Sequence, residues 1–112
     1  MFQFKNNMIK MTRGDSGSLK VDLKSSSNVP YTMRDGDTLT LTVKKSVKSE
    51  VLMQIISTTN TIYISPTDSK KLVVGNCVFD IELRTASGDV FTIIGLDDSG
   101  DKNMTVYAEV TE

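Results

Sequence analysis

Apolar and polar residues alternate in short runs along almost the whole chain, and this pattern restricts the fold more than any other feature. Successive side chains of a β-strand point to opposite faces, so a period of two indicates strands with one buried and one solvated face. Turn-forming residues separate the runs. The predicted strands are Met8–Met11, Leu19–Lys24, Leu39–Lys44, Val51–Ile56, Thr61–Ile64, Asn76–Arg84, Val90–Ile94 and Met104–Val110.

One segment differs from these runs. Ser65 can cap a helix, Pro66 suits a first helical position, and Asp68 follows the cap by three residues. These residues predict one short helical turn near residues 66–71. Because no helix is long enough to carry a crossover between parallel strands, we expect the strands to pair antiparallel.

The chain length sets the domain organisation. A chain of 112 residues has room for one domain, since globular domains most often contain about 100–150 residues. We expect a flexible N-terminal segment over residues 1–7 and a single β-sandwich domain over residues 8–112. The predicted fold class is all-β, an antiparallel immunoglobulin-like sandwich of about seven to eight strands.

Composition argues against an enzyme. The chain has no His and one Cys, which removes imidazole bases, the common Ser–His and Cys–His pairs and nearly all zinc sites. Asp80 and Glu82 share one strand face, where an exposed sheet surface explains them better than acid–base chemistry. Cys77 occupies an apolar position in an alternating run and is expected to pack as a small hydrophobic residue. We predict no catalytic residues, no cofactor and no metal site.

Charge and hydropathy restrict the partners and the location. A net charge of −1 gives no basic excess for binding nucleic acid. No apolar run approaches the roughly 20 residues that span a bilayer, and the first residues lack the pattern of a secretory signal. The expectations are no nucleic acid, no membrane, no signal peptide and no transmembrane segment.

Residues in the predicted loops are candidate contacts for a ligand. They combine an aromatic ring with clustered carboxylates on turns between strands: Tyr31, Asp35, Asp97, Asp98 and Asp101. The spacing of the last three does not match the helix–loop–helix calcium motif. The tripeptide Arg13-Gly14-Asp15 is the sequence that integrins bind in extracellular ligands, but a glycine turn between two strands explains it more simply.

The terminal strands are candidate edges of the sheets. Exposed strand edges pair readily with strands of other chains, and methionine provides an adaptable contact surface. A self-assembling module would use such edges, so the predicted interface residues lie in the first and last of the predicted strands: Met8, Ile9, Met11, Met104 and Val106.

Four segments together resemble a known family. They are a Gly-rich opening of a strand, an alternating strand after Gly36, the helical turn, and a hairpin near the end: Arg13–Leu19, Gly36–Val43, Ser65–Lys70 and Asp80–Ile93. This arrangement resembles the N-terminal immunoglobulin-like domain of tailed-phage baseplate upper proteins and related prophage structural proteins. In such proteins the domain commonly anchors a longer receptor-binding or fibre-attaching region.

The resemblance implies a non-enzymatic structural component of a phage or prophage particle, in the tail, the baseplate or as a head accessory, that acts through protein–protein interfaces. Its partners would be other copies of itself, as a homo-oligomer, or a neighbouring virion protein in a hetero-assembly. It would occupy the bacterial host cytoplasm before assembly and the virion afterwards. The alternative is a stand-alone binding module that recognises a carbohydrate or host-surface ligand through its loops.

Overall fold

The fold consists of β-strands and a short helical turn. The computed structural model describes residues 1–24, 27–96 and 102–110. Their elements, in chain order, are β1 (Phe2–Lys5), β2 (Met8–Thr12), β3 (Gly17–Lys20), β4 (Thr38–Lys44), β5 (Val51–Ser57), β6 (Thr61–Ile64), α1 (Pro66–Ser69), β7 (Gly75–Arg84), β8 (Val90–Ile94) and β9 (Met104–Tyr107).

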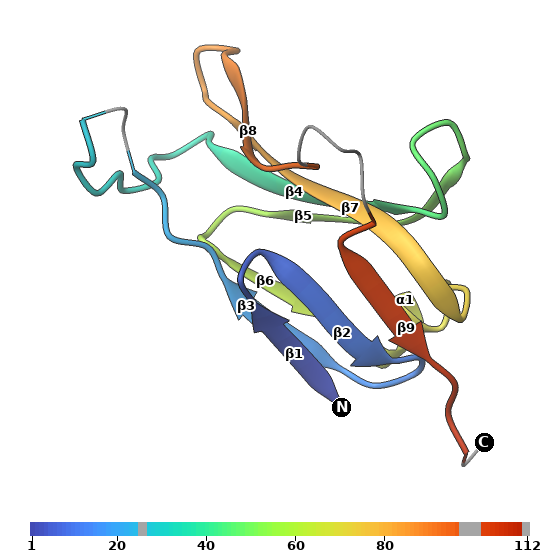
Figure 1. Ribbon diagram of the computed structural model, residues 1–112. Coiled ribbons are helices and arrows are strands. Elements are labelled where there is room, and N and C mark those ends of the chain that lie inside the picture. The colour runs from blue at the N-terminus through green and yellow to red at the C-terminus, as the bar shows by residue number, and fades with distance from the viewer. Residues whose placement is uncertain (25–26, 97–101, 111–112) are drawn as a thin grey trace.

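The strands form two sheets (Figure 1). In the larger sheet the order is β1-β2-β9-β7-β4-β5, and β8 also pairs with β7. The first three residues of β7 pair with β9, and the rest of the strand pairs with β4. The smaller sheet consists of β3 and β6, paired antiparallel. The predicted all-β sandwich is confirmed, with nine strands in the described residues where about seven to eight were expected.

The core lies between the two sheets and follows the predicted alternation. On β4, Leu39, Leu41 and Val43 are fully buried, and the threonines between them lie on the opposite face. From the small sheet, Ile62 and Ile64 are also fully buried. Because both sheets contribute one apolar face, this arrangement removes a single continuous set of side chains from water.

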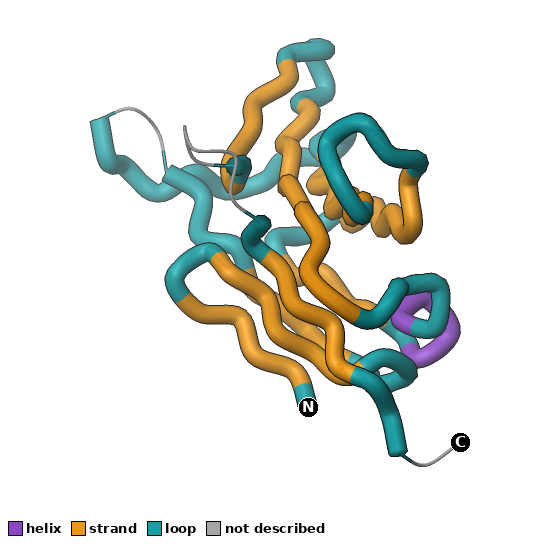
Figure 2. The backbone as a smooth tube through the Cα atoms, turned by 45° about the vertical axis from the view of Figure 1, so that its right-hand side comes forward, coloured by secondary structure: helices purple, strands orange, loops and turns teal. Residues whose placement is uncertain are grey.

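The predicted helical turn is confirmed as α1 (Figure 2). The Ser65 hydroxyl oxygen accepts a hydrogen bond from the Asp68 amide (3.1 Å), and the hydroxyl donates to the Asp68 carboxylate (3.0 Å). Pro66 occupies the first helical position. These contacts satisfy backbone donors at the start of the turn, which is the reason these residue types predict it.

The N-terminal segment is more ordered than expected. Residues 2–5, assigned to a flexible segment from the sequence, form β1 and pair antiparallel with β2. Asn6 and Asn7 make the tight turn between the two strands with φ values of 54° and 59°. Asparagine tolerates this left-handed conformation better than most residues. The Asn-Asn pair is therefore a hairpin signal that the sequence analysis missed.

One strand pair is parallel, contrary to the antiparallel prediction. β2 pairs parallel with β9, with Ile9 opposite Met104 and Met11 opposite Val106. The prediction rested on the absence of a crossover helix. That reasoning applies to strands close in sequence, whereas β2 and β9 come from opposite ends of the chain and most of the sandwich connects them. The larger sheet is therefore mixed.

Gly17 and Phe2 make a close contact that joins the N-terminal strand to β3. A Cβ atom at Gly17 would overlap the ring of Phe2. We expect Gly17→Ala to lower the free energy of unfolding by about 1–3 kcal/mol, because the ring must move. In a Phe2→Ala background the same substitution should cost much less. Urea denaturation of the four proteins measures this coupling, and equal costs in both backgrounds would contradict the contact.

Candidate binding groove at the loop end of the sandwich

The predicted interface residues are mostly in the core. Ile9, Met11, Met104 and Val106 are each at most 1% exposed, and they face one another across the parallel β2–β9 pair. Met8 is exposed. The prediction that the first and last of the predicted strands are edges is wrong, because β1 covers one side of β2 and β7 covers one side of β9.

Different strands form the edges of the large sheet. In the described part of the chain, β1 pairs with β2 alone, β5 with β4 alone, and β8 with β7 alone. β8 has exposed apolar side chains next to a loop cluster, since Val90 is 44% and Phe91 52% exposed. The candidate binding surface therefore lies at the end of the sandwich where β8 begins.

Asp37 organises that end of the molecule. Its side chain is almost fully buried and accepts three hydrogen bonds. One oxygen accepts from the Tyr31 hydroxyl (2.6 Å) and the Arg34 amide (2.9 Å), and the other accepts from the Ala86 amide (3.0 Å). The carboxylate thus ties the segment before β4 to the turn between β7 and β8.

These hydrogen bonds change the protonation of both side chains. The bond from Tyr31, followed by that from the Arg34 amide, holds the pKa of Asp37 below its usual value, although burial opposes this. The same bond raises the pKa of Tyr31, with burial and the Asp37 charge adding to the effect. At neutral pH the pair is therefore a charged acceptor and a neutral donor.

Gly36 allows the turn before β4 to approach the β7–β8 turn. Its φ is +90°, a conformation that favours glycine. A Cβ atom there would lie 2.8 Å from the Cβ of Ala86. The contact between Gly36 and Ala86 and the hydrogen bond between Asp37 and Ala86 hold the two turns together as one rigid unit.

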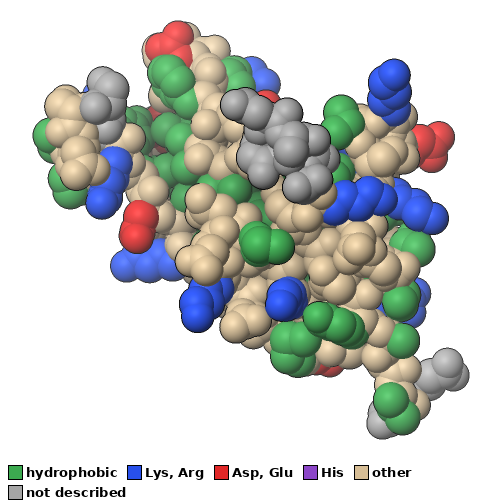
Figure 3. Space-filling model, in the orientation of Figure 1, with side chains coloured by type: hydrophobic (Ala, Val, Ile, Leu, Met, Phe, Trp, Pro, Cys, Tyr) green, Lys and Arg blue, Asp and Glu red, His purple; other side chains and the backbone are tan. Residues whose placement is uncertain are grey.

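A groove of about 520 Å³ lies beside this unit. Apolar and aromatic side chains dominate its lining, and among the described residues Lys24 is the one charged residue that lines it. The residues come from the chain before β4 and from β7 and β8: Leu23, Lys24, Tyr31, Leu83, Thr85, Phe91, Thr92 and Ile93. Figure 3 shows hydrophobic side chains gathered below the β7–β8 hairpin.

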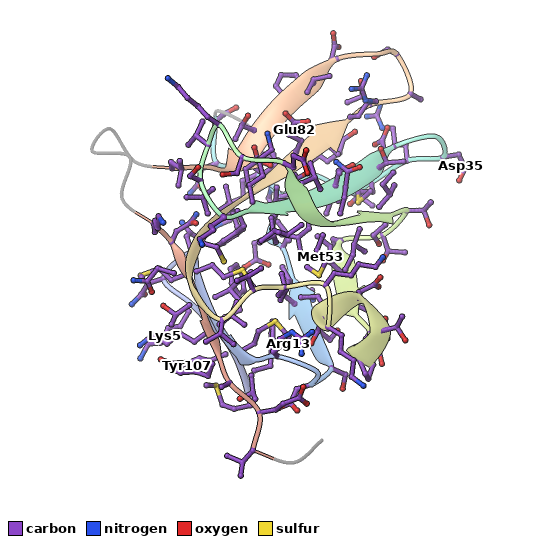
Figure 4. The ribbon with its side chains drawn as sticks, turned by 90° about the vertical axis from the view of Figure 1, so that its right-hand side faces the viewer. Lys5, Arg13, Asp35, Met53, Glu82 and Tyr107 are labelled. Carbon is purple, nitrogen blue, oxygen red and sulfur yellow. The ribbon has the colours of Figure 1, made fainter. Side chains whose placement is uncertain are left out.

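Two of the predicted loop contacts can be placed. Tyr31 lines the groove, where the hydrogen bond to Asp37 fixes its ring. Asp35 is exposed at the tip of the turn before β4 (Figure 4) and does not line the groove. Asp97, Asp98 and Asp101 lie outside the described residues.

Neither Phe91 nor Asp37 is among the site residues predicted from the sequence. Phe91 belongs to a recognisable strand, but its exposure depends on how far the small sheet extends, for which the sequence has no local signal. Asp37 follows an Asp-Gly turn and directly precedes an alternating strand. A carboxylate in that position is a signal for a hydrogen-bonded turn, and it could have been used.

Other residues with potential chemistry have structural roles. Arg13 donates to the carbonyl oxygens of Lys70 (2.7 Å) and Leu72 (3.0 Å) and pairs with Glu109 (3.2 Å). The Gly14 amide donates to the Ser69 hydroxyl (2.6 Å). The tripeptide at residues 13–15 is therefore a turn that ties β2 to the segment after α1, and the Arg13 guanidinium is engaged within the chain.

Cys77 and Asp80 lie on opposite faces of β7. Cys77 is buried in the core, and burial raises its pKa to about 11, so the thiol is neutral at neutral pH. Asp80 is half-buried beside Thr42 and Lys44 on the outer face. Burial, followed by the charge of Glu82, raises its pKa. Within the described residues, no group of three or more Cys, Asp or Glu side chains could hold a metal ion.

Comparisons with known proteins add no relative. No family model, no curated protein and no solved structure matches the chain. In the described ranges, no helix has the length and apolar character needed to cross a membrane.

Asp37→Asn tests the role of the buried carboxylate. An asparagine has the same size, but its NH₂ group must face a donor, so we expect a lower melting temperature. The folded-state pKa of Asp37 is depressed, so its stabilisation is present above the unfolded value of about 3.9 and is lost as pH falls through the folded value. The wild-type advantage over the variant should therefore shrink in acid.

Thermal unfolding followed by circular dichroism from neutral to acid pH measures this difference. Asp35→Asn is the matched control, because Asp35 belongs to the same turn and is exposed. It should leave the melting temperature nearly unchanged. A wild-type advantage over Asp37→Asn that stays constant down to low pH would contradict the assignment.

Proposed function

We propose that the chain is a non-enzymatic structural component of a phage or prophage particle that docks onto a neighbouring particle protein through the groove at its loop end. The observation that supports docking is the side chain of Phe91, which lines this groove and is 52% exposed. Exposed apolar side chains around a concave surface are typical of protein contact sites.

The construction of the groove fits a role in stable contacts. Phe91 is held on β8, which pairs with the central strand β7, and Tyr31 is fixed by Asp37. Side chains that are already ordered lose little conformational entropy when a partner binds. The free edge of β8 lies next to the groove, so a partner can combine apolar contacts with backbone hydrogen bonds.

The proposal that the chain belongs to a phage or prophage particle rests on the family resemblance. The chain resembles the immunoglobulin-like domain of phage baseplate upper proteins over most of residues 8–111. On that basis its partner is a neighbouring virion protein or another copy of the chain, and its location is the bacterial cytoplasm before assembly and the virion afterwards. The tail, the baseplate and a head accessory position all fit this role.

A second function has an observation in its favour. The rings of Tyr31 and Phe91 line the same groove, and Thr85, Thr92 and Lys24 add polar groups around them. Sugars bind by stacking on aromatic faces and by hydrogen bonding to such groups. A module that recognises a carbohydrate or host-surface ligand through its loop end is therefore the alternative to a particle component.

Two substitutions at Phe91 separate the functions. Phe91→Lys introduces a charge into the groove and should abolish both kinds of binding. Phe91→Leu keeps apolar volume but removes the aromatic face, so it should retain peptide or protein docking and lose sugar binding. Selection from a displayed library of short random peptides and a glycan array, each with wild type and both variants, provides the measurements.

The expected result is a set of peptides that bind wild type and Phe91→Leu, with affinity for Phe91→Lys reduced at least about tenfold, as for a central interface residue. The glycan array should be silent. Selective glycan binding that Phe91→Leu removes would establish the alternative. Binding of peptides that is equal in all three proteins would contradict the groove as the docking site.

The particle assignment has its own test. Particles are induced from the organism that encodes the chain, purified on a density gradient and analysed by quantitative mass spectrometry. We expect the chain at a fixed ratio to the major structural proteins, and removal of its gene should leave particles without it that fail to assemble fully. Its absence from purified particles would contradict the particle role and leave a binding module.

A further inference from the structure

The strand β5 forms the edge of the large sheet opposite to β8 and lacks most features that normally protect an edge. In the described residues it pairs with β4 alone. Its seven residues, Val51–Ser57, contain no charged side chain and no proline. Val51 is 48% and Ile56 64% exposed. Natural edge strands usually carry lysine, proline or another device that prevents pairing with a second chain.

The irregularity in β5 lies at one end and leaves most of the strand regular. The register with β4 shifts between Val43 and Lys44, which places an extra residue on β5 near Leu52. From Met53 to Ser57 the pairing with β4 is continuous. Met53 points into the core and is 1% exposed (Figure 4). The strand is therefore held firmly while its outer edge remains available.

We propose that β5 pairs with β5 of a second copy of this chain, antiparallel and about a two-fold axis at Gln54. An isologous contact brings the same residues of both copies together, so the surface must complement itself. With the axis at Gln54, Met53 lies opposite Ile55 of the second copy and Leu52 lies opposite Ile56. The two pairs next to the centre are then apolar, and Val51 lies opposite Ser57. The two Gln54 side chains lie side by side at the centre, and each donates a hydrogen bond to the Thr42 hydroxyl of its own copy (3.0 Å).

The exposed charges at the two ends of the β4–β5 hairpin favour antiparallel over parallel pairing. The end at which β4 joins β5 carries Lys44, Lys45, Lys48 and Glu50, a net charge of +2. In the turn before β4, the exposed charges of Arg34 and Asp35 cancel, and the Asp37 carboxylate is buried. Antiparallel pairing therefore places the basic end of each copy beside a turn without net exposed charge, whereas parallel pairing would place the two basic ends together.

The size of the contact predicts a reversible dimer. One pair of seven-residue edges, with the side chains beside them, buries less than the roughly 1,200 Å² at which standard stable interfaces begin. We therefore expect dissociation within an accessible concentration range. Backbone hydrogen bonds between the strands would give the contact its orientation.

This surface is independent of the groove. β5 and β8 lie on opposite sides of the β4–β7 pair, so a β5–β5 dimer leaves both grooves open. Failure of the dimer would not affect the groove as a docking site, and failure of the groove would not affect the dimer.

Substitution at the two-fold axis tests the pairing. Because Gln54 meets its own copy, both Gln54→Lys and Gln54→Glu should weaken the dimer at least about tenfold through like-charge repulsion. An equimolar mixture of the two variants should form a heterodimer, since opposite charges then meet. Gln3→Lys on β1 is the matched control, because Gln3 is also exposed on an edge strand.

Sedimentation equilibrium over a dilution series gives the dimer fraction of each protein, and native mass spectrometry of the mixture identifies heterodimers by mass. Circular dichroism confirms that the variants are folded, as expected for a substitution at an exposed site. Wild type, Gln3→Lys and Phe91→Lys should dimerise alike. A wild type that is monomeric at every concentration, variants that dimerise as wild type does, or a mixture without heterodimers would overturn the inference.

Discussion

The backbone pairing of β7 is the constraint on which the rest of the structure depends. This ten-residue strand bonds to β4 on one side and to both β8 and β9 on the other. Its inward side chains, Cys77, Phe79, Ile81 and Leu83, are all buried. Because a slip of one residue would turn these side chains toward water, their burial fixes the register of β7. The strands on both sides then take their positions from that register.

Two exposed surfaces follow from the position of β7. The strand extends past the end of β9, and its last residues pair with β8 in a hairpin that the small sheet does not cover. Phe91 lies on the inward face of that hairpin and remains exposed. On the other side of β7, the described residues place only β5 beyond β4, so this edge of the sheet is β5. The groove and the free β5 edge thus have a common origin, because the large sheet extends beyond the small sheet.

The sequence predicts the parts of this structure that local rules determine. Alternation identifies the buried residues of β4 and β7, and Ser65, Pro66 and Asp68 identify α1, because these signals act within a few residues. The order of the strands is a different kind of information. Ile9 and Met104 become partners only after the two ends of the chain meet in space. The sequence around either residue does not indicate which residue it will pair with. The same limit explains why terminal strands were expected at the edges.

The candidate site shows the same difference between features that the local sequence determines and features that depend on long-range contacts. Tyr31 stands out in the sequence because an aromatic residue in a polar turn segment needs a reason. Its partner Asp37 has local donors in Arg34 and Tyr31, but the hydrogen bond from the Ala86 amide forms only when a distant part of the chain is brought beside it. The spacing of residues in the sequence therefore does not predict long-range hydrogen bonds, even for a residue whose type and position are typical of a turn.

The geometry of the two surfaces has a consequence for assembly. A contact between two β5 strands is isologous and closes on itself after two copies. The partner that binds the groove is not related to it by the two-fold axis of the β5–β5 dimer. If the groove binds a different protein, growth stops at two copies of each, whereas a groove that binds this same chain would connect dimers into an open array. The identity of the groove partner therefore decides between a finite connector and an extending layer, and the β5 contact alone cannot produce the layer.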